Sequence, residues 1–494
     1  MNAAAYLLEI GRGDKVAIEE GDRTITYAEL REHVARSAAA WQALGVEPDD
    51  RVLVLAADSI DWVVAYLGAI WAGGVAVGLN SRLFERELSM ILAESGARYV
   101  WCDSDGAALL AACADSEEPG PELLPAADFT RLLAVARPTA PVERAEEEMA
   151  FWIYTSGTTG VPKAAIHPQR SVLASTDFVT DVLGGGADDK LYATSKLFFA
   201  YAQANSLCAA LRLGATLVLD REWATAERVA ALVARHRPTI LFTVPTLYLK
   251  TLQAGVTSQL DSVRHFVSAG EKLPVALRRS WREATGVLPL DCYGTSETDF
   301  LMLWSRDEQG RFSPTPRVEL RPRDPGRSLS SPQRVWLRHP SVALGYWRRP
   351  DESADAFDSG WFSPGDLFRF HGASDVEICG RADDMLKISG QWVSIHDVEQ
   401  ALTAGCGREV AELGAVTFEN EHGLASVAVF AVASPGRERQ AERLLHATID
   451  ALPKQKRPRA VRWTHELPRT ATGKLQRNKL RELLREPAQA AGPR

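Results

Sequence analysis

The sequence predicts an α/β fold: a large N-terminal region of layered α/β subdomains, followed by a small C-terminal α+β domain. Three observations lead to this prediction. The chain has 494 residues, which is longer than a typical single domain. Apolar residues make up 46% and charged residues 24%, an ordinary globular composition. Short apolar runs alternate with amphipathic stretches, as strands and helices do around a largely parallel sheet.

The elements of the large region follow from these runs in chain order. Residues 62–79 form an uncharged run of 18, but the glycine pair at 73–74 divides it. A buried helix over 62–71 and a buried strand over 75–79 are therefore expected, in preference to a membrane span. Further strands are predicted at 151–155, 215–220, 239–243, 264–268 and 288–291, and helices at 246–252 and 275–284. The Ala-, Glu- and Pro-rich stretch 107–148 and the segment 321–334 are interpreted as surface helix and loop.

A domain boundary is predicted near residues 380–384. The turn-rich segment before it contains Asp-Ser-Gly at 358–360 and Ser-Pro-Gly-Asp at 363–366. A new pattern follows, with a helix around 395–403, a strand around 425–433 and a helix around 437–451. We therefore expect one domain over 1–382 and a second over 383–494.

Charge and cysteine content exclude several classes of protein. Lys and Arg number 56 and Asp and Glu 64, a formal net charge of −8, which is not typical of a general nucleic-acid binder. The six cysteines are scattered and include no Cys-x-x-Cys pair, which argues against a disulfide framework or a zinc site. We expect no nucleic-acid partner, no membrane span and a cytoplasmic location.

Residues 154–163 carry the most informative motif. They read Tyr-Thr-Ser-Gly-Thr-Thr-Gly-Val-Pro-Lys and follow a predicted strand. Glycines allow the backbone to approach a ligand closely, and N–H groups, hydroxyls and a lysine can surround phosphate oxygens. The pattern is not a Walker A loop, because Lys163 follows Pro162 and precedes Ala164 rather than a hydroxyl residue. The segment predicts a phosphate-binding loop.

This loop and the segments after it resemble the adenylate-forming superfamily, which includes acyl-CoA synthetases, adenylation domains and luciferases. The resemblance covers nearly the whole chain, and its motifs occur in the family's order. They read Ile-Thr-Tyr-Ala-Glu-Leu at 25–30, Ser-Ala-Gly-Glu at 268–271, Tyr-Gly-Thr-Ser-Glu-Thr at 293–298, Gly-Trp-Phe with Gly-Asp within 360–366, Gly-Arg-Ala-Asp-Asp at 380–384, and Pro-Arg-Thr-Ala-Thr-Gly-Lys at 468–474.

Two further segments narrow the resemblance to benzoate-CoA ligases and related aryl-CoA ligases. They are Lys-Leu-Phe-Phe-Ala-Tyr at 196–201 and Lys-Ile-Ser-Gly-Gln-Trp-Val-Ser at 387–394. Two positions depart from the family pattern: Ala164 stands where glycine is common, and Ser296 where threonine is usual. Both residues are small and Ser296 keeps a hydroxyl, so the expected activity is unchanged.

The resemblance implies two half-reactions that use ATP, Mg²⁺ and coenzyme A. A carboxylate attacks the α-phosphate of ATP to give an acyl-adenylate and pyrophosphate, and a thiol then displaces AMP. Glu297 is implied as the magnesium ligand, since Mg²⁺ favours carboxylate and phosphate oxygens, and Ser296 as a contact of the α-phosphate. The implied ligands of the other ATP phosphates are Thr155, Ser156, Gly157, Thr158, Thr159 and Lys163. The implied adenosine site consists of Ala269, Gly270, Glu271, Tyr293, Gly294, Asp366 and Arg381.

The C-terminal domain carries the remaining implied roles. Lys474 matches the lysine that meets both the carboxylate and the α-phosphate in the family, and such alignment of reactants can supply on the order of 7–11 kcal/mol. Asp383 matches the hinge about which the small, mobile domain rotates between the half-reactions. After rotation, Ser389, Gly390, Gln391 and Trp392 would line the channel for the thiol.

A small aromatic carboxylic acid is the expected substrate. Phe198, Ala200 and Tyr201 are expected to form an apolar wall of the aryl pocket, together with Ser268, Thr295 and Thr298. Hydroxyls of the last three and the carboxyl of Asp299 offer hydrogen bonds to a ring substituent, so benzoate and anthranilate (2-aminobenzoate) rank first. Loading of the aryl group onto an acyl carrier protein in trans stays an alternative to CoA ligation. A dehydrogenase is not supported, because Gly184, Gly185 and Gly186 lack G-x-G-x-x-G spacing.

Overall fold

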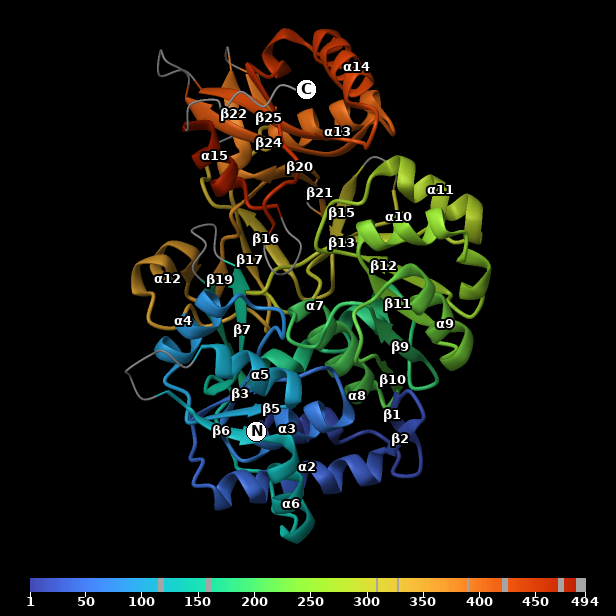
Figure 1. Cartoon of the computed structure of the whole chain (residues 1–494). Helices are drawn as coiled ribbons and strands as arrows, with labels where there is room; N and C mark the ends of the chain where they lie inside the picture. The colour runs from blue at the N-terminus through green and yellow to red at the C-terminus, as the bar shows by residue number, and fades with distance from the viewer. Residues whose placement is uncertain are drawn as a thin grey trace.

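The protein is described by a computed structural model that covers residues 1–113, 120–156, 162–307, 310–326, 328–372, 374–388, 391–419, 425–469 and 475–485. Two large sheets form most of the molecule, and the elements from β22 onward gather at one end of it (Figure 1). The predicted α/β class, with a large N-terminal region and a smaller C-terminal part, is confirmed.

The first large sheet has six strands. They run in the order β6 (Glu122–Pro125), β5 (Tyr99–Cys102), β3 (Arg51–Leu55), β4 (Val75–Gly78), β7 (Met149–Ser156) and β8 (Pro162–Pro168). All neighbours are parallel except β7 and β8, which form an antiparallel pair. The strand β6 lies in the stretch 107–148 that was predicted to contain only helix and loop. It is a short edge strand with one buried residue, so its apolar pattern is weak.

The second large sheet has eleven strands. Its order is β2 (Arg23–Thr26), β1 (Val16–Glu20), β10 (Thr216–Leu219), β9 (Lys190–Ala193), β11 (Ile240–Thr243), β12 (His265–Ser268), β13 (Leu290–Tyr293), β14 (Leu303–Ser305), β15 (Arg311–Pro314), β21 (Asp375–Arg381) and β20 (Asp366–Gly372). The run from β1 to β13 is parallel, and the strands from β14 onward are antiparallel. The carboxyl ends of the parallel strands therefore share one edge.

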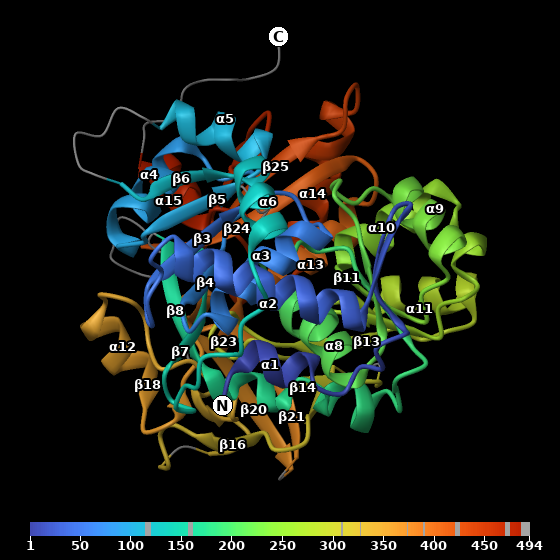
Figure 2. The same ribbon diagram turned by 90° about the horizontal axis from the view of Figure 1, so that it is seen from below.

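Helices between and beside the sheets complete the large region. The helix α3 (Ile60–Trp71) is the predicted uncharged helix, and ten of its twelve residues are buried. It lies beside α2 (Tyr27–Ala43), toward the end of the molecule opposite the C-terminal part (Figure 1 and Figure 2). One hydrophobic core joins α2 and α3 to residues of both large sheets. A second core lies between the strands and the three helices on one flank of Figure 1, α9 (Ala226–His236), α10 (Pro245–Ala254) and α11 (Val275–Thr285).

The segment from Ala200 to Leu213 is one helix with a wide turn in it. It begins as α7 (Ala200–Ala202), continues as the π-helix η3 (Gln203–Cys208) and ends as α8 (Ala209–Leu213). Every residue of the π-helical part is buried. Such π-turns are rare and often occur at functional sites.

Smaller elements cover the sheets and link them. They are α1 (Ala3–Leu8), α4 (Glu85–Ser95), α5 (Ser104–Ala112), α6 (Ala126–Val135), η1 (Gln169–Ala174), η2 (Phe178–Val182), η4 (Thr257–Leu260), α12 (Pro350–Ala356), and a four-stranded sheet in the order β16 (Glu319–Pro322), β17 (Val335–Arg338), β19 (Trp361–Phe362) and β18 (Phe357–Asp358). Among the helices that the structure describes, none has both the length and the apolar character needed to cross a membrane.

The C-terminal part has its own sheets and core. Its elements are η5 (Ala382–Asp384), the pair β22 (Met385–Ile388) and β23 (Gln391–Ser394), the three-stranded sheet β24 (Val410–Glu419), β25 (Ala425–Ala433) and β26 (Ala460–Trp463), η6 (Lys454–Lys456), and the helices α13 (Ile395–Cys406), α14 (Glu438–Ala451) and α15 (Arg477–Arg485). Its two hydrophobic clusters draw their described members from residues 393–484 alone. A division at 383 stays a prediction, which this separate core supports.

Candidate active site

The predicted phosphate loop connects the two strands of an antiparallel hairpin. Thr155 at the end of β7 and Lys163 at the start of β8 are direct cross-strand partners. Gly157, Thr158 and Thr159 lie outside the described residues, and Ser156 is the last residue of β7. The loop leads into a strand, β8, whereas a P-loop leads directly into a helix.

Lys163 is linked to Glu297 through a residue that the sequence did not single out, Tyr346. The Lys163 ammonium lies 5.5 Å from the centre of the Tyr346 ring and 3.6 Å from Glu352 Oε1. The Tyr346 hydroxyl donates a 2.7 Å hydrogen bond to Glu297 Oε1. Burial and the Glu297 carboxylate raise the pKa of Tyr346, so its hydroxyl stays a neutral donor. Backbone pairing of residues 344–347 with β8 fixes this arrangement.

The loop after β13 carries Ser296 and Glu297, and hydrogen bonds within the loop hold its conformation. The Thr298 hydroxyl donates to the Thr295 carbonyl at 3.1 Å and accepts from the Thr295 N–H at 3.0 Å. The imidazole of His167 lies with Nε2 2.8 Å from the Ser296 carbonyl and Nδ1 3.2 Å from the Ser341 carbonyl. Burial lowers the pKa of His167 to about 4, so the ring is neutral at physiological pH. It therefore orients the loop without adding charge to it.

Three predicted adenosine residues meet at the junction of β13 with β20 and β21. Asp366 and Arg381 are cross-strand partners, with Arg381 Nη1 4.0 Å from Asp366 Oδ2. The Tyr293 hydroxyl donates to the same Asp366 oxygen at 2.7 Å. A side chain at Gly365 would begin 2.7 Å from the Arg381 guanidinium, which would have to shift to make room for it. The structure thus brings together the residues that the sequence assigned to the ribose and the adenine.

The other adenosine candidates follow the neighbouring strand ends. Ala269 is buried directly after β12, and Gly270 has a φ of +85° that favours glycine. Glu271 is exposed and accepts a 3.3 Å hydrogen bond from the Thr246 hydroxyl. A side chain at Gly294 would begin 2.8 Å from the Phe300 carbonyl oxygen, so this glycine permits a close backbone approach.

The predicted aryl residues differ in whether their polar groups are available. Phe198 is 7% exposed and packs against Phe199 with ring centroids 4.3 Å apart, and Ala200 is also buried. The Tyr201 hydroxyl donates to the Val267 carbonyl at 2.8 Å, so its polar tip is engaged by the backbone. Thr298 is engaged in its own loop. By contrast, the hydroxyls of Ser268 and Thr295 are buried without a hydrogen-bond partner in the described part of the chain.

Several predicted residues of the C-terminal domain cannot be placed. Lys474, Ser389 and Gly390 lie outside the described residues. Asp383 lies in η5, and Gln391 and Trp392 lie in β23.

Arg477, near Lys474 in the sequence, is not a solvated helix charge but forms ion pairs within the C-terminal part. Its guanidinium donates to Glu399 at 2.7 Å and lies 3.7 Å from Asp384. Arg481 also reaches Asp384, at 3.4 Å. The helix after the lysine loop is thereby tied to η5, the segment that contains the expected hinge residue.

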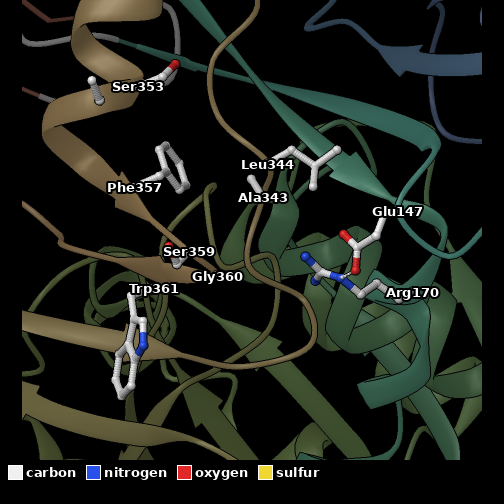
Figure 3. A pocket seen from close by; sticks show the side chains of 10 residues that line it. Glu147, Arg170, Ala343, Leu344, Ser353, Phe357, Ser359, Gly360 and Trp361 are labelled. Atoms are coloured by element: carbon white, nitrogen blue, oxygen red, sulfur yellow. Dashed lines mark hydrogen bonds and ion pairs between the residues drawn. The ribbon is translucent and has the colours of Figure 1, made fainter.

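An open pocket of about 570 Å³ adjoins the site but contains none of its predicted residues. Glu147 and Arg170 lie on one side of it and Phe357 and Trp361 on the other (Figure 3). The pocket touches the site through Ala343, whose N–H donates to the Glu297 carbonyl at 2.9 Å.

Comparison with known proteins agrees with this geometry. Residues 10–347 match the family described as AMP-binding enzyme, and the chain belongs to that family. A 3-hydroxybenzoate/4-hydroxybenzoate-CoA ligase of Thauera aromatica is 37% identical over 98% of this chain and 97% of its own length.

Solved structures give the same result. A benzoate CoA ligase from Burkholderia xenovorans LB400 is 31% identical and superposes with a TM-score of 0.86, covering 97% of this chain and all of the other. An anthranilate CoA ligase in complex with anthranoyl-AMP is 28% identical with a TM-score of 0.87, covering 98% of this chain and 97% of the other. The expected kinship with adenylate-forming enzymes, and with benzoate-CoA ligases among them, is confirmed.

Replacing Tyr346 by phenylalanine tests the link between Lys163 and Glu297. The ring beside Lys163 stays, but the hydrogen bond to the Glu297 carboxylate is lost. Loss of one hydrogen bond to a charged group costs roughly 1.5–3 kcal/mol, so ATP–pyrophosphate exchange should fall about ten- to hundredfold. Tyr192→Phe is the matched control, since its buried hydroxyl has no partner among the described residues. Exchange by Tyr346→Phe at the wild-type rate would contradict the link.

The neutral state of His167 predicts a pH-dependent contribution to stability. Its pKa is lowered from 6.5 to about 4 by burial. Between pH 6.5 and pH 4 this histidine binds a proton in the unfolded chain but not in the folded protein. The free energy of unfolding therefore falls by up to roughly 3 kcal/mol as the pH is lowered from 6.5 to 4. Urea unfolding of wild type and His167→Gln should show a stability difference that shrinks over this range. The exposed His33, changed to Gln, is the control, and a constant difference for His167→Gln would contradict the prediction.

Proposed function

We propose that the protein is an ATP-dependent aryl-CoA ligase, an acid–thiol ligase that activates benzoate or a substituted benzoate through an acyl-adenylate. The observation that carries the proposal is the presence of two groups of side chains beside the loop that follows β13. Lys163, Tyr346 and Glu297 form the first group, and Tyr293, Asp366 and Arg381 the second. The first suits a triphosphate with its metal ion and the second a nucleoside. Relatives named as benzoate-, hydroxybenzoate- and anthranilate-CoA ligases share nearly the full length.

The donor set fits magnesium bound together with phosphates. No group of three or more His, Cys, Asp or Glu that suits a metal ion occurs within the described ranges, and Glu297 supplies a single carboxylate. Mg²⁺ commonly binds through one or two carboxylates plus substrate phosphates. When bound, it neutralises charge on the phosphates. Tyr346 would hold the Glu297 carboxylate in place for this role.

The residues of the first half-reaction act mainly by placing charge. The attacking carboxylate is already an anion, so no general base is required, and repulsion from the phosphates is the main obstacle. Thr155 and Lys163, with the loop between them, would hold the β- and γ-phosphates. Ser296 would contact the α-phosphate, and Lys474 would contact both reacting anions. Asp366 and Arg381 would fix the ribose, so that the α-phosphate faces the acid.

The second half-reaction needs the small domain. We propose that residues 383–494 rotate about Asp383 against residues 1–382, and that residues 389–392 then line a channel for coenzyme A. The separate core of residues 393–484 supports a domain that moves as one body. Transfer to a carrier protein is not favoured, because relatives that are 37% and 38% identical are named as CoA ligases. No disulfide joins the six cysteines, all of which lie within the described ranges, and this supports a reducing, cytoplasmic setting.

ATP–pyrophosphate exchange across benzoate, hydroxybenzoates, 2-aminobenzoate, cinnamate, octanoate and phenylalanine tests the proposal. A small aromatic acid should give the highest kcat/KM, followed by thioester formation with free coenzyme A. A higher kcat/KM with octanoate or phenylalanine than with every benzoate would contradict the assignment of an aromatic substrate. Only membership of the AMP-binding family would then stand. Acyl transfer to a phosphopantetheinyl carrier protein but not to free coenzyme A would favour the carrier alternative.

Lys474→Ala should separate the half-reactions. Its charge is needed where carboxylate and α-phosphate meet, so adenylation should be abolished. Transfer of the acyl group from a supplied aryl-adenylate to coenzyme A should stay largely intact. Single-turnover assays of each step measure this, and equal loss of both would contradict the role of Lys474.

Asp383→Pro should have the opposite effect. Proline fixes φ near −65° and restricts rotation at the hinge. Pyrophosphate exchange should survive while thioester formation falls. A variant with normal rates in both steps would exclude Asp383 as the hinge.

A further inference from the structure

The carboxyl group of Asp299 is buried without a partner. Its residue is 2% exposed, and neither carboxyl oxygen has a hydrogen-bond partner within the described ranges. Other buried carboxyl groups of the chain are paired: Asp58 accepts from the Leu197 N–H at 3.1 Å, and Asp189 from Arg264 at 2.6 Å. An unpaired buried carboxyl is costly, so its presence calls for a partner other than the residues that the structure describes.

The surroundings of Asp299 connect it to the predicted aryl pocket. The pKa of Tyr66 is raised by burial and, to a smaller extent, by Cys208 and Asp299. The pKa of Cys208 is raised by burial and by Asp299. Asp299 therefore lies near α3, which carries Tyr66, and near the π-helix η3, which carries Cys208. The loop is held to η3 by a 3.4 Å hydrogen bond from the Leu301 N–H to Asn205 Oδ1.

An aromatic wall continues from there to Phe198. Tyr66 stacks on Trp62 with ring centroids 4.6 Å apart. A side chain at Gly78 would begin 3.0 Å from the Trp62 ring and 3.2 Å from Phe198, so these two residues flank the same glycine. These contacts form a row from Phe198 through Trp62 to Tyr66, the residue near Asp299. The unpartnered hydroxyl of Thr295 belongs to the same loop as Asp299.

We propose that Asp299 is a specificity-determining residue that accepts a hydrogen bond from a hydroxyl or amino substituent on the ring of the aromatic acid. The inference rests on the proposed function. The ring O–H or N–H would supply the partner that the buried carboxyl lacks. An unsubstituted ring would leave that carboxyl unpaired, and sites built to hydrogen-bond a substrate group reject analogues without it.

A purely local reason for aspartate at this position makes a different prediction. The φ of Asp299 is +60°, in the left-handed region where Asp, Asn and Gly are favoured. If backbone conformation were the whole reason, glycine would replace Asp299 without any change in substrate preference. The carboxyl has no other role in that account.

Asp299→Gly therefore separates the two accounts. The kcat/KM for 3-hydroxybenzoate, 2-aminobenzoate and benzoate is measured by pyrophosphate exchange in wild type and variant. Wild type should favour at least one substituted acid over benzoate. In Asp299→Gly that preference should fall about ten- to hundredfold, with turnover of benzoate retained. The substituted acid whose advantage is lost shows whether hydroxyl or amino is recognised.

Two further variants make the test decisive. Asp291→Asn changes another buried carboxyl, 6% exposed on β13, and should leave the preference unchanged. If Asp299→Gly does not fold, Asp299→Ala, which also removes the acceptor, replaces it, and equilibrium binding of 3-hydroxybenzoate, 2-aminobenzoate and benzoate is compared. An unchanged preference in the folded variant, or a wild-type preference for benzoate over both substituted acids, overturns the inference. Failure of wild type to activate any benzoate would instead overturn the proposed function.

Discussion

The shared edge formed by the carboxyl ends of β11, β12 and β13 is the constraint on which the site depends. Parallel pairing places Thr243 opposite Ser268, and Tyr293 closes the next strand. Ligands of open parallel sheets bind outside such an edge, because the loops after every strand converge there. The antiparallel continuation through β14, β15, β21 and β20 then brings Asp366 to the Tyr293 hydroxyl. One sheet therefore supplies both the loops near the acid and the ribose pair.

A reaction between two anions also explains how charge is arranged around Glu297. An arginine or lysine in the place of Tyr346 would neutralise Glu297 and compete with a metal ion for it. A tyrosine hydroxyl orients the carboxylate and leaves its charge in place. The neutral His167 acts in the same way on the Ser296 carbonyl. The fixed positive charge is instead concentrated in Lys163 and Arg381, where phosphate and ribose are expected.

The sequence predicted the helices and strands that follow from a local pattern and the site residues that belong to a family motif. The uncharged helix and strand at 62–79 and the strand before the phosphate loop have strong periodicity, and they lie where expected. The family motifs assigned Asp366 and Arg381 to one site, and the structure shows that they are cross-strand partners. Tyr346 could not be found in this way, because its role depends on backbone pairing of residues 344–347 with β8, far away in sequence. The π-turn at 203–208 has no pattern of its own, and the ion pairs of Arg477 are tertiary contacts.

The polar residues around the expected acid differ in function according to whether their side chains already have a hydrogen-bond partner in the protein. The hydroxyls of Tyr201 and Thr298 are hydrogen-bonded to the backbone, so they stiffen the walls and cannot distinguish one substituted ring from another without losing those bonds. Ser268, Thr295 and Asp299 are buried and have no hydrogen-bond partner among the described residues, so they are the groups that the proposed acid would satisfy. In a pocket of this kind, the side chains that are hydrogen-bonded to the protein fix the shape. The side chains that lack a partner provide the selectivity. Members of one family can thereby keep the adenylation site and change the acid through a few buried side chains.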